Sequence, residues 1–245
     1  MAYQPVVRTA DRTLAAVEAL ARWTHPRLGS IPPDRFIELA ESRGMIIPLG
    51  LKLMGIVVRQ AAAWRSRFPG KCPTIHVNIS PLQFAGSDVI ADFLDLLEQH
   101  DLPPSDFCIE VTESAFTNAD AVRAMRDALR LGFKVTMDDF GIGYSALSQL
   151  PRLPLVSIKL DRSFISQAAD NPDDAAMLTA IVQLAHALKL KVIAEGVERA
   201  DQFDLVAEFG CDGVQGFFFS RPMAPDQFDA WLSGETPLSV EPQTV

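Results

Sequence analysis

Cysteine and histidine are scarce in this sequence, with three and four residues respectively among 245. The cysteines, Cys72, Cys108 and Cys211, are far apart and form no CxxC pair. A disulfide framework or a structural zinc site needs such pairs or clusters, so both are excluded. Thiols of this kind suit the reducing cytoplasm, and we expect a cytoplasmic domain.

Basic residues are also in deficit, because 22 Lys and Arg face 31 Asp and Glu, for a formal net charge of -9. The charges are interspersed and form no basic stripe, so no long nucleic acid is expected as a partner. A small phosphate ligand stays compatible with this charge if a cation or a few local Arg and Lys residues offset the repulsion.

Long hydrophobic runs are the third absence. No apolar run is expected to reach membrane-spanning length, and the first residues lack the charged and apolar regions of a signal peptide. We therefore expect no membrane segment in this chain, although a parent protein could be membrane-anchored. No break in composition marks a second domain, so the sequence predicts one domain over residues 1–233 and a flexible C-terminal tail over 234–245.

Short β-branched and aromatic runs alternate with segments of helical periodicity. Strands are expected at 3–8, 15–23, 74–80, 107–114, 134–140, 156–163, 191–198 and 213–220. Helices are expected at about 33–43, 48–67, 87–100, 119–131, 173–189, 200–209 and 225–233. This alternation predicts an α/β fold, a (β/α)8 TIM-like barrel. Only "TADRTL" separates the first two strands, too little for a helical crossover, so the first strand is expected to run antiparallel to its neighbours.

Alternate residues on these strands divide into an apolar set and a polar set that faces the barrel axis. Barrel enzymes place their chemistry at the C-terminal ends of the strands. So many carboxylates around one mouth would repel one another unless a cation compensates, and oxygen ligands suit Mg2+ or Mn2+ better than zinc. The polar set at that end comprises Glu18, Asn78, Glu110, Asp138, Lys159, Glu195 and Gln215.

The stretch "DDFGIG" adds a second carboxylate, Asp139, and two glycines, Gly141 and Gly143. Adjacent carboxylates could serve two ions a few ångströms apart, as in two-metal sites for phosphoryl displacement. The glycines allow the following loop to order over a substrate. Lys159 would stay charged among the acids and could orient a water or a phosphate oxygen. His76 is expected to be a buried, hydrogen-bonded histidine and not a ligand.

Several motifs occur in one order between Tyr3 and about Leu232. They are "EALARW" (18–23), "NIS" (78–80), "EVTES" (110–114), "DDFGIGYSAL" (138–147), "IKLD" (158–161), "AEGVE" (194–198) and "QGFFFSRP" (215–222). Together these motifs resemble the EAL domain family. The resemblance implies a barrel with one reversed strand that hydrolyses cyclic di-GMP to linear pGpG with two Mg2+ or Mn2+ ions. Ile142 and "QGF" depart from the more usual Gly-Thr-Gly or Gly-Ala-Gly loop and from "QGY".

The resemblance also implies roles for individual residues. Glu18, Asn78, Glu110 and Asp138 would hold one metal ion, and Asp138 and Asp139 the second. Lys159 would hold the hydrolytic water, with Glu195 as base or water-orienting group and Gln215 ordering the site. Gln4 and Arg22 would contact the nucleotide. Glu113 would anchor the regulatory loop that includes Gly141, Gly143, Tyr144 and Ser145, which in this family links homodimer contacts to the metal site; sensory or GGDEF domains are expected in the parent chain.

Two other functions stay open at this point. The first is a receptor that binds cyclic di-GMP without cleaving it, which loss of a ligand or of Lys159 would favour, and neither is lost. The second, argued without the family, is a barrel enzyme that abstracts a proton next to a carboxylate, as enolase-type enzymes do. The Asp pair and Arg22 fit a phosphodiester better.

Overall fold

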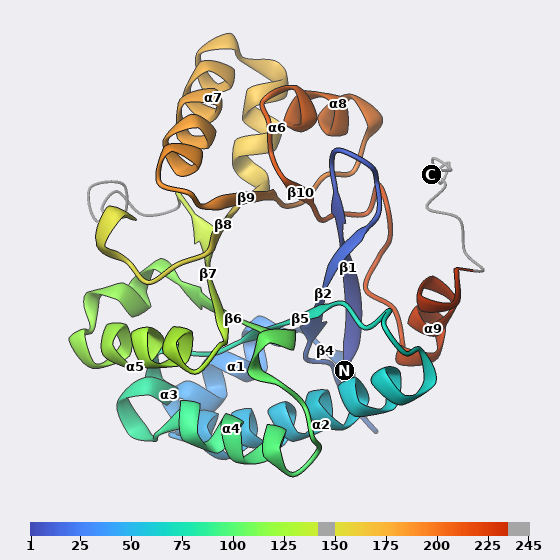
Figure 1. The fold of residues 1–245 in the computed structure, drawn as a ribbon, viewed down its shortest axis with the longest axis vertical. Helices are drawn as coiled ribbons and strands as arrows, with labels where there is room; N and C mark the ends of the chain where they lie inside the picture. Colours follow the sequence, from blue (N-terminus) through green and yellow to red (C-terminus); the bar gives the residue numbers. More distant parts are fainter. Residues whose placement is uncertain (142–149, 235–245) are drawn as a thin grey trace.

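Eight strands close into a barrel in the computed structural model, which describes residues 1–141 and 150–234 (Figure 1). The barrel order is β1-β10-β9-β8-β7-β6-β5-β2. β1 is antiparallel to both β2 and β10, and the other neighbours pair in parallel, so the predicted reversed strand is confirmed. The barrel strands are β1 (Ala2–Arg8), β2 (Leu14–Leu20), β5 (Thr74–Asn78), β6 (Phe107–Thr112), β7 (Lys134–Phe140), β8 (Ser157–Leu160), β9 (Lys191–Ala194) and β10 (Gly213–Val214).

The reversed strand follows from the short connection that the sequence predicted. Residues 9–13 join β1 to β2 as a hairpin, with Val7 opposite Leu14 and Gln4 opposite Glu18. The Arg8 amide donates to the Thr13 carbonyl at 2.8 Å and closes the turn. A hairpin needs antiparallel strands, whereas every other barrel connection is long enough for a crossover.

The last strand is shorter than predicted, because β10 ends at Val214 and not near residue 220. The backbone turns away after Gln215 and bonds the loop that follows β9: the Phe218 amide donates to the Val197 carbonyl at 3.0 Å. Phe218 and Phe219 pack against Phe203, with ring centroids 5.6 and 5.5 Å apart respectively, instead of continuing a strand. Apolar composition alone could not distinguish these two placements.

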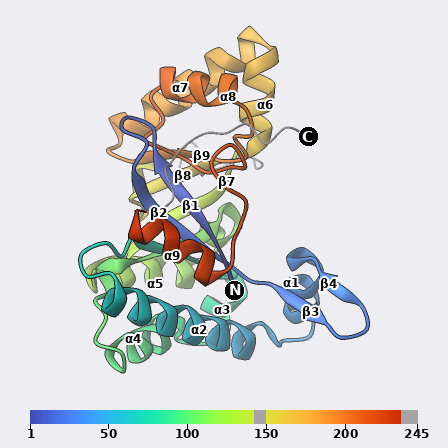
Figure 2. The ribbon, with the colours of Figure 1, turned by 90° about the vertical axis from the view of Figure 1, so that its right-hand side faces the viewer.

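Predicted strand 15–23 also contains two elements instead of one. β2 ends at Leu20, and a separate two-stranded hairpin follows, β3 (Trp23–His25) with β4 (Gly29–Ile31). Together with helix α1 (Pro33–Ser42), it projects beyond one end of the barrel, to the right in Figure 2. Trp23 is partly exposed there, and its ring packs edge-on against Phe36 of α1.

Helices cover the outside of the barrel, and the seven predicted helices are all present. Two short ones were missed: α3 (Pro81–Gly86), which Ser80 caps, and α6 (Arg162–Asp170), which Asp161 caps. Asn171 caps α7, and Pro172 stands at its first position, where a missing amide hydrogen costs nothing. The other helices are α2 (Ile46–Arg67), α4 (Val89–Glu98), α5 (Ala119–Arg130), α7 (Pro172–Ala187), α8 (Ala200–Glu208) and α9 (Pro225–Ser233), with 3-10 turns η1 (Pro104–Asp106), η2 (Glu113–Thr117) and η3 (Leu150–Arg152).

The core lies between the strands and the helices. The apolar set of alternate strand residues points outward into this core, as expected: Ile75, Ile109, Val135 and Ile158 are fully buried there. Under α2 and α9 the ring of Tyr3 meets Trp64 edge-on at 4.7 Å, and Trp64 donates to Asp229 Oδ1 at 2.9 Å. Because neighbouring strand residues point to opposite sides, the polar set of alternate residues points into the barrel.

α2 corrects one expectation. It is long and apolar enough, by length and composition alone, to cross a membrane, so the expected absence of any such run is wrong. Its buried face packs on the barrel through Met54, Val57, Val58, Ala61 and Trp64. The core helix of a globular domain meets the same criteria. The predicted tail beyond Gly234 lies outside the described residues.

Candidate active site

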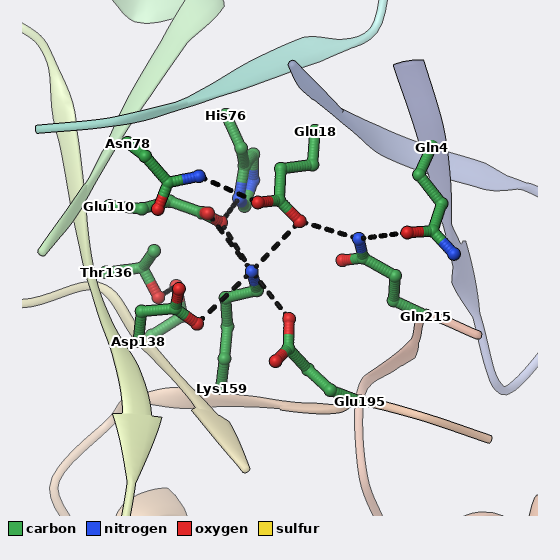
Figure 3. A network of polar contacts seen from close by, with 11 residues as sticks. Gln4, Glu18, His76, Asn78, Glu110, Thr136, Asp138, Lys159, Glu195 and Gln215 are labelled. Carbon is green, nitrogen blue, oxygen red and sulfur yellow. Dashed lines mark hydrogen bonds and ion pairs between the residues drawn. The ribbon is translucent and has the colours of Figure 1, made fainter. Parts of the chain in front are cut away.

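The polar residues predicted at the strand ends meet at one mouth of the barrel. Figure 3 shows the Lys159 amine at the centre of four carboxylates. Its Nζ lies 2.6 Å from Glu195, 3.0 Å from Glu110, 3.2 Å from Glu18 and 3.3 Å from Asp138. These acids come from four different strands or strand ends, which only the closed barrel brings together.

Lys159 is held in its charged form. It is 1% exposed, and burial alone would lower the pKa of its amine, but Glu110, Glu18, Glu195 and Asp138 raise that pKa well above its ordinary value. A buried ammonium among buried carboxylates keeps its proton because either charge alone would be costly to desolvate.

Glu18 stays ionised within this ring. Burial would raise the pKa of its carboxyl group, yet Lys159 and hydrogen bonds from Gln215 and Asn78 outweigh burial and lower the pKa to about 2. Gln215 Nε2 donates to Glu18 Oε2 at 2.6 Å, and Asn78 Nδ2 donates to Glu18 Oε1 at 2.7 Å. Glu18 is therefore a charged carboxylate at any ordinary pH.

Glu110 behaves in the opposite way although it shares Lys159. Complete burial and the Glu18 charge raise the pKa of Glu110 well above its ordinary value. His76 Nδ1 lies 2.6 Å from Glu110 Oε1, and burial together with Lys159 lowers the pKa of His76 to about 3. The neutral His76 imidazole and Glu110 share this hydrogen bond, so the prediction of a buried, hydrogen-bonded histidine is confirmed.

Glu195 and Asp139 are the remaining acids at this mouth with a shifted pKa. Burial, with the charges of Asp138 and Glu18, raises the pKa of Glu195 to about 7 in spite of Lys159. Burial and Asp138 also raise the pKa of Asp139. One carboxylate oxygen from each of Asp138, Asp139 and Glu195 lies within 4.8 Å of the others, a spacing that a bound cation could bridge.

A break in β7 makes that cluster possible. Neighbouring residues on a strand face opposite sides, which would send Asp138 and Asp139 apart. The pairing of β7 with β8 shifts between Met137 and Phe140, and Asp139 has φ of 53°, in the left-handed region. Two consecutive carboxylates therefore reach the same mouth, at a backbone cost of about 1–2 kcal/mol.

The loop after β7 begins with a required glycine. Gly141 has φ of 101°, and a Cβ there would overlap the ring of Phe164 on α6. The other predicted loop residues, Gly143, Tyr144 and Ser145, with Ile142, lie outside the described residues. Glu113, their predicted anchor, starts η2 and buries Oε2 without a hydrogen-bond partner among the described residues.

The predicted nucleotide contacts fall in two places. Arg22 lies after β2 and lines a cavity of about 720 Å³ together with Glu18, Asn78, Glu110, Asp138 and Asp139. Gln4 is buried behind the mouth, where it accepts from Gln215 Nε2 at 3.2 Å and donates to the Ser220 carbonyl at 3.1 Å.

The sequence reasoning missed residues on the outer wall of the same cavity. Ser80 Oγ donates to Glu41 Oε1 at 2.5 Å, and Asp34, Ile37 and Leu53 lie on the same wall. Glu41, Asp34, Ile37 and Leu53 belong to α1 and α2, which no strand alternation marks. Ser80, in the β5–α3 turn, does follow the alternation of Asn78. Ser80 rather than Asn78 caps the turn, which leaves the Asn78 amide free to reach Glu18.

The donor set fits hard divalent cations. Five carboxylates (Glu18, Glu110, Asp138, Asp139 and Glu195) share one mouth with a single lysine among the described residues. Asp138 Oδ1 and Gln215 Oε1 are buried and accept no hydrogen bond there, although Asp138 Oδ1 lies 3.3 Å from Lys159 Nζ. An excess of oxygen ligands with unused lone pairs is the chemistry that Mg2+ and Mn2+ prefer.

Known proteins resemble this chain over most of its length. The bifunctional diguanylate cyclase/cyclic di-GMP phosphodiesterase MucR of Pseudomonas aeruginosa is 41% identical over 227 residues, which are 92% of this chain and 33% of MucR. The cyclic di-GMP phosphodiesterase PdeR of Escherichia coli is 39% identical over 231 residues, 94% of this chain and 34% of PdeR. The chain thus spans about a third of the length of these relatives.

Solved structures share the fold. The PaMucR phosphodiesterase in complex with c-di-GMP has a TM-score of 0.87 at 38% identity, covering 93% of this chain and 92% of that one. The EAL enzyme Bd1971, bound to cAMP and cyclic-di-GMP, has a TM-score of 0.89 at 31% identity, covering 96% of this chain and 64% of that one. The sequence itself matches the EAL domain over residues 1–222. With this match across nearly its whole length and the same barrel as these structures, the chain belongs to the EAL domain family.

Proposed function

We propose that this domain hydrolyses cyclic di-GMP to linear 5'-pGpG and so lowers the level of this second messenger. One observation carries the proposal: Lys159 and the five carboxylates at the barrel mouth form the acid-rich site that phosphodiester hydrolysis with divalent cations needs. The names of MucR and PdeR, both cyclic di-GMP phosphodiesterases, support the substrate.

The proposed cofactors are two divalent cations, Mg2+ or Mn2+. Glu18, Asn78, Glu110 and Asp138 would hold one, and Asp138 and Asp139 the other. When bound, such ions polarise the phosphate and make an attacking water more acidic. The Asn78 carbonyl oxygen is free for this role because its amide nitrogen already serves Glu18.

Lys159 and Glu195 would manage the attacking water. Glu195 contacts Lys159 at 2.6 Å and has a pKa raised to about 7, so near neutral pH its carboxylate can accept a proton from water. Lys159, fixed by four carboxylates, would orient the water or a phosphate oxygen. The water oxygen would then bond to phosphorus while its proton passes to Glu195, the P–O3' bond would break, and the departing O3' would take a proton from solvent water.

The remaining assignments concern the substrate and its control. Arg22, on the cavity wall, would contact a phosphate, while Gln4 and Gln215 would order Glu18 from behind. We further propose a cytoplasmic homodimer in which Glu113 and the loop after Gly141 transmit contacts to the site. Sensory or GGDEF domains in the parent chain would supply the input.

Chromatography of cyclic di-GMP incubated with the purified chain and Mg2+ or Mn2+ tests the proposal. We expect pGpG to form, to disappear with EDTA, and to be lost in Glu18→Gln and Lys159→Met. The matched controls are Glu38→Gln on the exposed face of α1 and Lys52→Met on the exposed face of α2, which should retain activity. If calorimetry shows that cyclic di-GMP binds while chromatography shows that it stays intact, the domain is a receptor and not an enzyme. Activity retained in Lys159→Met would refute the assigned site.

A further inference from the structure

A second cavity, of about 660 Å³, lies at the opposite mouth of the barrel. Its lining comes from the N-terminal ends of the parallel strands and the C-terminal end of the reversed β1. No residue lines both this cavity and the active-site cavity. The strand-end residues that line it are Arg8, Thr74, Lys134, Ser157, Lys191 and Gly213.

Small side chains make this half of the barrel hollow. Barrel interiors of this class are usually filled by layers of bulky branched residues. Here the small residues Ala16, Cys108, Ser157 and Gly213 line the interior instead, and His76 lies between this cavity and the active site. Val6, Ala16 and Ile193 form a small apolar cluster of their own, separate from the outer core.

The rim of this cavity is positively charged in a chain of net charge -9. Lys134 Nζ donates to Thr74 Oγ1 at 2.8 Å, and neither Lys134 nor Lys191 has a carboxylate partner within the described part of the chain. Arg8 lies 3.5 Å from exposed Asp11. The cavity's one acid, Asp212, already accepts from the Val192 amide at 2.8 Å and contacts His186 at 3.0 Å.

A simpler explanation of Lys134 and Lys191 would be that they balance the charge of the active-site acids. Lys134 and Asp138 are four residues apart on β7, and Lys191 and Glu195 are four residues apart along and just after β9. Four residues of strand separate the two charges of each pair by about 13 Å. Lys191 is exposed, and at physiological ionic strength charges farther apart than about 8 Å are largely screened when solvent reaches them. Balance alone therefore gives little reason for a basic rim around a hollow.

We propose that the N-terminal mouth binds a small organic phosphate. Lys134, Lys191 and Arg8 would hold the phosphate at the rim, where the Lys134 amine is within reach of the Thr74 hydroxyl. Val6, Val156 and Ile193 would receive an apolar body inside, and the volume is in the range of small-molecule sites. This site is independent of the proposed hydrolysis at the other mouth.

Methyl-resolved NMR on the complete chain in EDTA provides the test, with phenyl phosphate as the probe. Without divalent cations the carboxylates around Lys159 repel anions, so the active-site cavity does not compete. We expect the methyl signals of Val6, Val156 and Ile193 to shift on titration. Phenol lacks the charge and inorganic phosphate lacks the apolar body, and both should bind at least about tenfold more weakly.

Variants link the shifts to the rim. Lys191→Met should weaken phenyl phosphate binding about tenfold or more, Lys191→Arg should keep it, and Lys52→Met on α2 should leave it unchanged. Lys191 is exposed, so its replacement should not disturb folding. Absence of shifts at these methyls, shifts that Lys191→Met leaves unchanged, or equal affinity for inorganic phosphate would overturn the proposal.

Discussion

Replacing Lys159 with methionine removes the cation that touches four carboxylates while roughly keeping side-chain length. Glu195, Glu110, Glu18 and Asp138 lie 2.6 to 3.3 Å from its Nζ, and all are mostly buried. Without divalent cations nothing else in the described ring balances them. We expect the metal-free variant to be markedly less stable than wild type above neutral pH.

The magnitude follows from burial. Removing one partner of a buried ion pair costs about 3–5 kcal/mol, and for a chain of this size each kcal/mol lowers Tm by about 2–4 °C, so a loss of about 10 °C is expected. The raised pKa keeps Lys159 charged well beyond neutrality, so pH dependence of the effect comes from the carboxylates. At about pH 5 these acids take up protons more readily and the loss should shrink.

Differential scanning fluorimetry in EDTA at about pH 8 and about pH 5 measures this loss, with Lys52→Met as the matched control. Added Mg2+ should raise Tm more in Lys159→Met than in wild type, because a divalent cation then meets four carboxylates without a competing ammonium. A metal-free Tm within about 2 °C of wild type at about pH 8 would show that the carboxylates are not held together by Lys159.

Three further predictions concern the site and its support. In the metal-free protein, Glu195 should contribute less stability at about pH 8 than at about pH 5, because folded Glu195 keeps its proton up to about pH 7 whereas the unfolded chain loses it near 4.5. His76, whose pKa is lowered to about 3, has the opposite pH dependence, so the effect of Glu195 is measured against a Glu195→Gln variant. In circular dichroism melts the Tm of wild type relative to Glu195→Gln should fall over this window, and a relative Tm that rises would contradict the prediction. Gly216→Ala places a Cβ against the Val197 backbone and should cost about 2 kcal/mol in urea unfolding. The cost should exceed that of Gly55→Ala on α2, where the new methyl meets only side-chain atoms of Arg59 and Leu96 at 3.4 and 3.9 Å; equal costs would refute the close approach. Asp139→Gly should stabilise the metal-free chain by about 1 kcal/mol, because it relieves the left-handed backbone at this position and the repulsion by Asp138. Calorimetry should show weaker Mg2+ binding by this variant. Asp139→Asn removes the charge but keeps the backbone strain, so a larger stabilisation by Asn than by Gly would show that strain is not the cause.

Strand alternation accounts for what the sequence predicted well. The facing of Glu18, Glu110 and Lys159 toward the axis depends only on the period of two, which each strand obeys locally. The prediction failed where a segment's partner decided its conformation. Residues 215–220 were predicted as strand, yet their backbone bonds the loop after β9. Phe218 packs on Phe203 of α8, and no local pattern shows that these two segments meet.

The sequence by itself determined the fold class, the reversed first strand and the set of polar residues at the active mouth, because periodicity and connection length are local properties. Only the tertiary structure decided which of those residues are charged and how their pKa values differ. Glu18 and Glu110 share one lysine, and burial raises the pKa of both. Hydrogen bonds from Gln215 and Asn78 help to lower the pKa of Glu18, whereas the Glu18 charge raises that of Glu110 further. The left-handed Asp139 and the hollow above Lys134 likewise arise from closure of the barrel, which sets distances between residues far apart in the chain.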